Sequence, residues 1–331
     1  MKILFEHPVP AGLAHGGMQT QIDQTKAALE TLGVEVEYLR WWDERQSGDL
    51  IHFFGRMSPE LILFAQRRGI RVVLSVLLAA QGARPGWKLW LQRQTTRLMR
   101  AALPAGLTAA YRWDAYRMAD AAIALTPWEG QVLNYLFAVP PEKIHVVPNG
   151  VEAEFFAAPP EERGPWLVCT GTITERKRMV ELAEAALLAR TPLWVVGKPY
   201  AESDPYAQRF LHLARQHPDL LRYEGPILAR ADLARVYRQA RGFVLLSENE
   251  SLSLSALEAA ACQCPLLLSD HRWARSAFAA QASYAAVPGS PRATAQALRQ
   301  FYDAAPLLTP PAKPPGWLDV AAQLKKLYES L

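Results

Sequence analysis

The sequence predicts an α/β protein of two domains, each built on a doubly wound parallel sheet with helices on both faces. Short apolar strand patterns alternate with helical patterns along most of the chain, which is typical of parallel sheets. A loop at about residues 149–160 interrupts this alternation, which then resumes. The 331 residues are enough for two domains, each with its own core.

The N-terminal half begins with a short buried strand and then alternates. Strands are expected at 2–5, 34–39, 50–54, 71–76, 121–125 and 144–147. Helices are expected at 18–32, from 59 to about 69, and at 127–137. The second of these helices has a start signal, because Ser58 can cap it and Pro59 fits the first helical position. We assign residues 1–155 to an N-terminal Rossmann-like domain.

The C-terminal half repeats the pattern. Strands are expected at 166–169, 193–196, 221–223, 243–246 and 266–268, and helices at 175–189, 206–216, 231–240 and 254–261. We assign 156–306 to a second Rossmann-like domain. Residues 307–331 are predicted to form a Pro-rich linker and a final helix, which we expect to return toward the N-terminal domain. Ligands of such sheets bind beyond the carboxyl ends of the strands, so we expect a site in a cleft between the domains.

Composition restricts the functional classes. Half of the residues are apolar and 21% are charged, which is typical of a soluble globular protein. The formal charge of +4 is too small an excess to indicate a nucleic-acid partner. The longest apolar run, 72–80, is far shorter than the roughly 18 residues of a membrane span. No signal peptide is recognisable, and we expect a cytoplasmic protein with its three cysteines reduced.

The segment from Ser247 to Asp270 is the most informative. It passes from a strand through a polar turn into a helix, with Glu250 before the helix and Glu258 inside it. The amide groups of residues 251–254 fall at the helix N-terminus, where unpaired donors and the helix dipole suit a diphosphate. Glu258 can then accept hydrogen bonds from a ribose and Glu250 from a sugar. The alternative is two surface carboxylates around an ordinary helix cap formed by Ser253.

A second segment, from Gly171 to Leu182, also lies at a strand-to-helix turn. It places Arg176, Lys177 and Arg178 in the expected first helical turn. Cations at this end of a helix oppose its dipole, so local stability does not explain them, whereas a bound anion would. The alternative is a solvated basic cluster.

In this order and spacing, the motifs resemble those of the retaining glycosyltransferases of family 4, which have the GT-B fold. The resemblance covers nearly the whole chain. It consists of the Gly16-Gly17 loop, the stretch from Ala119 through Thr126 to VVPNGVE at 146–152, the loop 171–177, the Glu250/Glu258 pair with EAAACQCP, and the final helix from Trp317. The chain departs from the family pattern at Thr172, where an Arg is common, and at Ser253 and Gln263, where glycines are usual.

The resemblance implies a nucleotide-sugar donor site. Lys177 would hold the diphosphate, Glu258 the ribose and Glu250 the transferred sugar, with Glu250 and Lys177 as the catalytic pair. Gly16 and Gly17 would let the backbone of the first domain approach the diphosphate closely, because they have no side chain. The predicted donor-binding residues are Gly16, Gly17, Gly171, Thr172, Arg176, Lys177, Glu250, Ser251, Leu252, Ser253, Leu254 and Glu258.

The expected reaction is transfer of a sugar from a nucleotide diphosphate to a glycan or lipid-linked acceptor. We expect the acceptor to bind the N-terminal domain, residues 1–155. No Asp-x-Asp motif occurs, so we expect no metal and no cofactor, with cations and helix-end amides stabilising the departing diphosphate. Retention follows from the resemblance, by attack on the same face; a carboxylate nucleophile remains an alternative. Two other functions stay open, a nucleotide-sugar epimerase of the same fold and a non-catalytic nucleotide- or glycan-binding relative.

The stretch 82–113 combines six basic residues and no acid with Trp87, Trp90 and several leucines. Tryptophans beside basic residues suit an anionic membrane surface, so peripheral contact at the inner face of the membrane is one interpretation. A helix packed on its own domain with a solvated basic face is the other.

Overall fold

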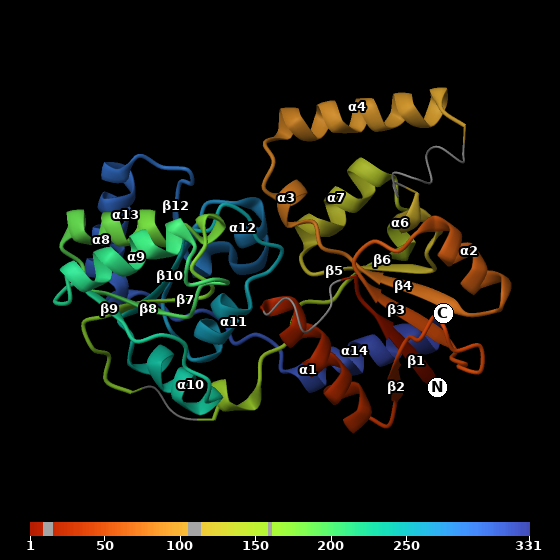
Figure 1. Cartoon of the computed structure of the whole chain (residues 1–331), viewed down its shortest axis with the longest axis horizontal. Coiled ribbons are helices and arrows are strands. Elements are labelled where there is room, and N and C mark those ends of the chain that lie inside the picture. Colours follow the sequence, from red (N-terminus) through yellow and green to blue (C-terminus); the bar gives the residue numbers. More distant parts are fainter. Residues whose placement is uncertain (9–15, 105–113, 158–160) are drawn as a thin grey trace. The chain divides into compact units, whose positions relative to one another are not determined.

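The computed structural model describes residues 1–8, 16–104, 114–157 and 161–331 (Figure 1). The chain forms two compact units, the first made of 1–150 and 317–331 and the second of 151–316. The sequence-based boundaries were 155 and 306. In the structure, the chain passes between the units at 150–151 and again at 316–317. These two crossings lie side by side: the amide of Val151 donates to Pro315 O at 3.1 Å, and Val151 forms a β-bridge with Gly316. The final helix belongs to the first unit.

The described part of the first unit has a six-stranded sheet whose paired strands are all parallel. The order across the sheet is β2 (Glu35–Tyr38), β1 (Lys2–Glu6), β3 (Leu50–Phe54), β4 (Arg71–Ser75), β5 (Ala121–Ala124) and β6 (Ile144–Val146). The helices are α1 (Gly17–Thr31), α2 (Pro59–Arg67), α3 (Ala79–Gly82), α4 (Gly86–Ala102), α6 (Ala115–Met118), α7 (Pro127–Phe137) and α14 (Trp317–Ser330).

Successive residues along the strands of this sheet point to its two faces, and apolar side chains pack on both faces. Val72 and Leu74 of β4 pack in one cluster with side chains of α2, α4, α6 and α7. Helices α1 and α14 pack against each other (Figure 1), and His52 of β3 reaches Tyr328 of α14. Because successive strand side chains point to opposite faces, the apolar runs predict a sheet covered on both sides.

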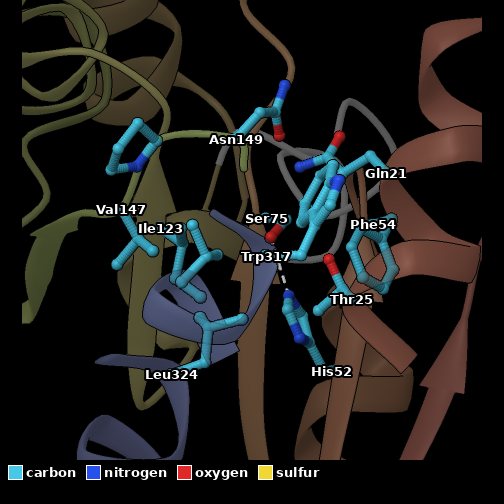
Figure 2. Close-up of a pocket in the computed structure, with 12 residues that line it drawn as sticks. Gln21, Thr25, His52, Phe54, Ser75, Ile123, Val147, Asn149, Trp317 and Leu324 are labelled. Carbon is cyan, nitrogen blue, oxygen red and sulfur yellow. Dashed lines mark hydrogen bonds between the residues drawn. The ribbon is translucent and has the colours of Figure 1, made fainter. Parts of the chain in front are cut away.

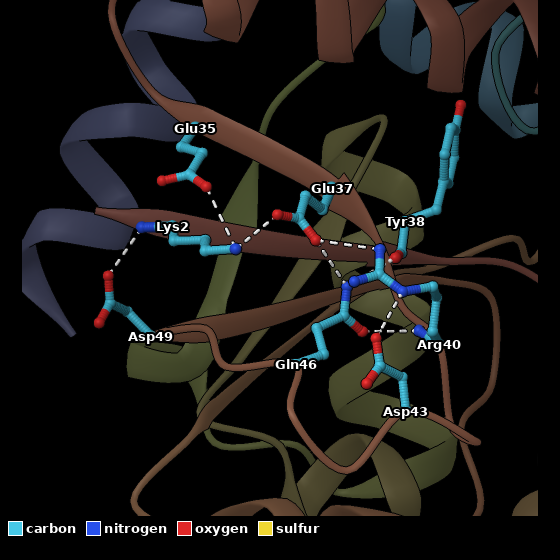
Figure 3. A network of polar contacts seen from close by, with 8 residues as sticks. All are labelled: Lys2, Glu35, Glu37, Tyr38, Arg40, Asp43, Gln46 and Asp49. Atoms are coloured by element: carbon cyan, nitrogen blue, oxygen red, sulfur yellow. Dashed lines mark hydrogen bonds and ion pairs between the residues drawn. The ribbon is translucent and has the colours of Figure 1, made fainter.

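Strand β2 forms one edge of the first sheet, and charged side chains surround it (Figure 3). Lys2 Nζ lies 3.1 Å from Glu35 and 2.5 Å from Glu37, and Glu37 also contacts Arg40 at 3.1 Å. The amide side chain of Gln46 donates to Glu37 at 2.9 Å. Hydrogen bonds from Lys2 and Gln46 lower the pKa of Glu37 to about 2. Charges on an edge strand oppose pairing with a further strand.

The second unit contains a six-stranded parallel sheet in its described residues, with a single reversal of strand order. The order is β9 (Leu221–Tyr223), β8 (Leu193–Val196), β7 (Leu167–Thr170), β10 (Gly242–Leu245), β11 (Leu266–Ser269) and β12 (Ser283–Ala285). Strand β7 comes first in the chain, and β8 and β10 flank it. This arrangement makes the carboxyl ends of β7 and β10 the topological switch point, where doubly wound sheets bind ligands.

The helices of the second unit flank this sheet (Figure 1). They are α8 (Met179–Ala189), α9 (Pro205–Gln216), α10 (Arg230–Gln239), α11 (Leu254–Ala261), α12 (Arg272–Phe278) and α13 (Pro291–Ala304). Five short 3-10 turns join elements along the described chain, at Pro141–Lys143, Ala153–Phe155, Glu175–Lys177, Ala279–Gln281 and Ala305–Leu307. Strand β12, α12 and α13 were not predicted from the sequence. Strand β12 and α12 are short, with three and seven residues. Helix α13 has 14 residues and a Ser290 cap, so its sequence carried signals that could have identified it.

Three glycines end neighbouring strands of the second sheet at its carboxyl edge. Gly171, Gly197 and Gly225 have φ values of +153°, +149° and +83°. The amide of Gly171 donates to Val196 O at 3.0 Å, and that of Gly197 donates to Gly225 O at 3.2 Å. A Cβ on Gly197 would lie 1.9 Å from the carbonyl oxygen of Gly171. The strand ends approach this closely only because no side chain separates them.

A buried histidine ties the C-terminal helix to the first sheet. His52 Nδ1 lies 2.6 Å from Tyr328 Oη, and its Nε2 lies 2.7 Å from Ser75 Oγ. Figure 2 shows His52 beside a cavity of about 10 Å³, lined also by Thr25, Asn149 and other side chains. A cavity of that size has room for about one water molecule. Burial lowers the pKa of His52 to about 3, so the ring is neutral in the folded unit.

Nearby, Gly150 packs against the start of α14. A Cβ at Gly150 would lie 2.7 Å from the Cα of Trp317. No described helix is long and apolar enough to cross a membrane.

Gly197→Ala is expected to lower the free energy of unfolding of the second unit by more than about 2 kcal/mol, because the new Cβ clashes with a backbone carbonyl at a strained φ. Urea unfolding measures this loss. Gly225→Ala is the matched control, since its φ is +83° and a Cβ added there would have no atom within 4 Å. The control variant should lose only the free energy needed to place an alanine in the left-handed region, about 1–2 kcal/mol. Equal losses in the two variants would contradict the clash.

The stability of the first unit is expected to fall as the pH decreases from about 6.5 toward about 3. Below the ordinary pKa of about 6.5, the unfolded chain binds a proton at residue 52 that the folded unit excludes. The loss reaches about 2–3 kcal/mol at pH 4.5. Hydrogen exchange of β3 and β4 amides at several pH values measures it. His52→Gln should be less stable at pH 7 but show a shallower acid slope, whereas exposed His217→Gln should keep the wild-type slope.

Candidate active site

The predicted site residues of the second unit gather at the carboxyl ends of β7 and β10. These adjacent strands are the ones that flank the switch point. The segment 171–178 follows β7, and the segment 246–253 follows β10. A backbone hydrogen bond joins the two segments, from the amide of Glu248 to Arg176 O at 2.9 Å. The sheet topology therefore brings together two stretches that lie about 70 residues apart in the chain.

Two cations converge on one carboxylate oxygen at this edge. Lys177 Nζ lies 2.6 Å from Glu250 Oε1, and Arg176 Nη1 lies 2.9 Å from the same oxygen. The Lys177 and Glu250 side chains are only 10% and 11% exposed. Arg176 is more exposed and also donates to the carbonyl of Asn249 at 2.9 Å. The structure thus brings together the two residues predicted to be catalytic.

The charge state of Glu250 follows from this pairing. Burial by itself raises the pKa of the carboxyl, but the positive charges of Lys177 and Arg176 outweigh burial and leave the pKa of Glu250 below its ordinary value. Glu250 is therefore ionised at neutral pH.

The expected helix at 175–189 begins later than predicted. Residues 175–177 form a 3-10 turn, Arg178 has φ +55°, and α8 starts at Met179. The left-handed Arg178 interrupts the α-helical path, so Arg176 and Lys177 precede the helix instead of occupying its first turn. The prediction of their place in a helical turn was wrong. The turn carries both side chains toward Glu250 instead.

The predicted helix start after Glu250 is present. Ser253 caps α11, because its Oγ accepts a hydrogen bond from the amide of Ala256 at 3.3 Å. Ser251 and Leu252 lie in the turn before the cap, and Leu254 is the first helical residue. The first amides of a helix have no partner within the helix, so this end remains suited to an anion.

Glu258 lies inside α11 and is 7% exposed. Its Oε1 accepts from Arg230 Nη2 at 2.5 Å, and its Oε2 accepts from the Tyr237 hydroxyl at 3.0 Å. Tyr237 Oη also lies 2.5 Å from Thr170 Oγ1, at the end of β7. Burial raises the pKa of Glu258, and Arg230 opposes that rise only in part. Arg230, Tyr237 and Thr170 were missed by the sequence analysis.

The remaining predicted residues lie in separate places. Gly171 and Thr172 form the loop after β7, directly before the 3-10 turn. Gly16 and Gly17 belong to the first unit, at the start of α1, and Gly16 has φ +154°. Residues 9–15, which precede this pair, lie outside the described residues. Within the described ranges, no group of three or more His, Cys, Asp or Glu side chains is placed to hold a metal ion.

Two family models match the chain in succession. A model described as Glycosyltransferase Family 4 matches residues 37–155, and one described as Glycosyl transferases group 1 matches residues 164–304. The matched stretches lie in the first and the second unit in turn, apart from a short overlap at the crossing.

Curated relatives carry the name D-inositol 3-phosphate glycosyltransferase. The protein from Actinosynnema mirum is 34% identical over a stretch that covers 45% of this chain and 40% of that protein. The one from Jonesia denitrificans is 30% identical and covers 51% of this chain and 45% of the relative. The chain therefore spans less than half the length of these relatives.

Solved structures share the fold across the whole chain. A glycosyltransferase from Rickettsia africae has a TM-score of 0.68 at 14% identity, covering 99% of this chain and 98% of that one. The Anabaena protein HepE, in complex with UDP and glucose, has a TM-score of 0.64 at 14% identity, and both chains are covered in full. These structures show that the chain has the GT-B fold. The two family models, which match 37–155 and 164–304, show that the chain belongs to glycosyltransferase family 4.

Proposed function

We propose that the protein transfers a sugar from a nucleotide diphosphate donor to a glycan or lipid-linked acceptor. The observation that carries this proposal is the Lys177, Arg176 and Glu250 cluster at the switch point of the second sheet. Two cations face one carboxylate, so the cluster has one positive charge in excess. An ammonium group has three donor positions and Lys177 uses one on Glu250, which leaves two for phosphate oxygens.

The cluster also supports a division of roles. Lys177, Arg176 and the α11 amides would stabilise the negative charge that grows on the departing diphosphate. Glu250 is ionised and lies against Lys177, so it can accept hydrogen bonds from the hydroxyls of the transferred sugar. We propose that this charge stabilisation proceeds without a metal ion or cofactor. Retention of configuration is part of the same proposal and rests on family membership.

Uridine nucleotides are the first donors to test. The fold neighbour HepE is described in complex with UDP-glucose, and a pneumococcal O-GlcNAc transferase is described in complex with UDP and GlcNAc. Both share the fold at low identity, so they suggest a donor class for this chain without specifying the sugar.

UDP is expected to raise the melting temperature of the protein without added metal, and Lys177→Ala and Glu258→Ala are expected to abolish the rise. A ligand that binds only the folded state raises its stability. The measurement is a thermal-shift panel of UDP, GDP, ADP and dTDP and of their common nucleotide sugars. Each ligand is tested first in the presence of a chelator and then with magnesium.

The matched control is Arg209→Ala, which removes an exposed cation paired with Glu184 elsewhere on the second unit. It should respond to the nucleotide like the wild type. No shift with any of these nucleotides at millimolar concentration would overturn the donor site. Release of sugar epimers without an acceptor would favour the epimerase instead.

Helix α4 supports peripheral membrane contact as part of this proposal. Its outer face carries Trp87, Trp90, Leu91 and Leu98, whose exposed fractions are 64%, 55%, 50% and 69%. Spacings of three, four and seven residues place these side chains on one face of a helix. The opposite face packs on α7 through buried Leu89, so it leaves the apolar stripe uncovered among the described residues.

Charge favours an anionic membrane as the occupant of that stripe. Residues 82–113 contain no acid, and the exposed cations Arg84, Lys88 and Arg97 flank the apolar face. Arg93 and Arg100 instead turn toward α7, since Arg93 lies 4.3 Å over the Tyr135 ring and Arg100 donates to Phe137 O at 3.2 Å. Tryptophans between flanking cations are typical of helices that lie in a membrane interface.

The protein is expected to sediment with vesicles containing roughly one-third phosphatidylglycerol, and less with pure phosphatidylcholine or at high salt. The variant Trp87→Ser/Leu98→Ser should weaken binding about tenfold, because it removes the apolar groups that enter the interface. Phe64→Ser, which removes an exposed aromatic ring from α2, should bind like the wild type. Equal binding by all three proteins would contradict the role of α4.

A further inference from the structure

Glu258 is a buried carboxylate whose surroundings decide whether it is ionised. Helix α11 packs against α10, β10, β11 and the turn at 153–155. Strands β10 and β11 contribute no titratable side chain. Arg230 and Tyr237 come from α10, and Glu152 comes from the segment before the turn. Cys262 caps the C-terminal end of α11, one turn beyond Glu258. It is buried, and burial raises the pKa of its thiol to about 12, so the thiol is neutral.

Arg230 links two carboxylates through one nitrogen. Its Nη2 lies 2.5 Å from Glu258 Oε1 and 2.9 Å from Glu152 Oε1. The guanidinium also lies over the Phe155 ring, 4.7 Å from its centroid. Burial disfavours the charged guanidinium, but Glu258 and Glu152 outweigh burial and raise the pKa of Arg230. Two carboxylates share one cation here, so the triad has one negative charge in excess.

The hydrogen bonds from Arg230 and Tyr237 leave part of the accepting capacity of the two Glu258 oxygens unused. A carboxylate oxygen has two lone pairs. Arg230 occupies one lone pair on Oε1, and the Tyr237 hydroxyl occupies one on Oε2. One lone pair remains on each oxygen. Two adjacent acceptors on a carboxylate held in place match the two hydroxyl donors of a vicinal diol.

We propose that Arg230 is a positioning residue for the nucleoside, which holds Glu258 ionised and oriented so that both of its oxygens accept from the ribose diol. This inference rests on the proposed donor site and adds to it the residue that sets ribose selectivity. Without Arg230, the buried Glu258 would lose the cation it pairs with and would still feel the negative charge of Glu152. It would then take up a proton, because burial and a like charge both disfavour the ionised form.

The test compares affinities for UDP and 2′-deoxy-UDP, or for whichever diphosphate the thermal-shift panel favours, by calorimetry from pH 6 to pH 8.5. Wild type is expected to prefer the ribonucleotide with little change across this range. Arg230→Gln should weaken UDP binding about tenfold at pH 6 and reduce the preference over 2′-deoxy-UDP. Both losses should shrink as the pH rises, because a higher pH favours the ionised form of Glu258.

Two further variants separate positioning from a general structural role. Arg230→Lys keeps the charge and should retain a flat pH profile. Arg235→Gln removes an exposed cation from the same helix and should match the wild type in affinity and profile. Melting temperatures confirm that each variant is folded, and Arg230→Lys provides the readout if Arg230→Gln does not fold.

The outcomes distinguish this inference from the donor site itself. If wild type binds UDP and Arg230→Gln keeps its affinity and pH profile, Arg230 does not position Glu258. Tighter binding by Arg230→Gln would show that the guanidinium competes with the diol, which also overturns the inference. If wild type binds no nucleotide, the donor site and the role of Arg230 fall together.

Discussion

The organisation of the second unit depends on burying two carboxylates at the carboxyl edge of one sheet. An ionised carboxylate loses its hydration on burial, and only a close cation or several hydrogen bonds make up for that loss. Glu250 is stabilised by Lys177 and Arg176, and Glu258 by Arg230 and Tyr237. These partners come from the loop after β7 and from α10, so the carboxylates fix the positions of segments that are distant in sequence.

The two carboxylates have opposite electrostatic surroundings. Glu250 faces two cations and its pKa is lowered, whereas Glu258 shares Arg230 with Glu152 and its pKa is raised. A group of two cations and one anion attracts an anion, and a group of two anions and one cation suits neutral hydrogen-bond donors. A nucleotide presents a diphosphate beside a ribose diol. In the function proposed above, the group with two cations would face the diphosphate and the group with two anions would face the ribose diol.

Local sequence signals predicted the regular elements and failed where long-range contacts decide the structure. Helices α7 and α11 match their predicted ranges, because Thr126 and Ser253 cap them and apolar residues fill their buried faces. The start of α8 was misplaced, since nothing local marks Arg178 as left-handed. Arg230 was missed for a related reason. Its partners lie 28 and 78 residues away, and only the folded sheet brings them together.

The departures from the family pattern are accommodated by side-chain hydrogen bonds. Gln263 follows α11 with φ +56°, a conformation that favours the glycine usual at this position. Its Nε2 donates to Pro311 O at 2.8 Å, and its carbonyl accepts from Arg163 Nη2 at 2.7 Å. Ser253, where another glycine is usual, caps α11. The helix that carries Glu258 is thus fixed at both ends by side chains. A glycine at 253 would lack the capping hydroxyl, and a glycine at 263 would lose the hydrogen bond to Pro311 while its backbone carbonyl could still accept from Arg163. These substitutions therefore favour a more rigid placement of Glu258.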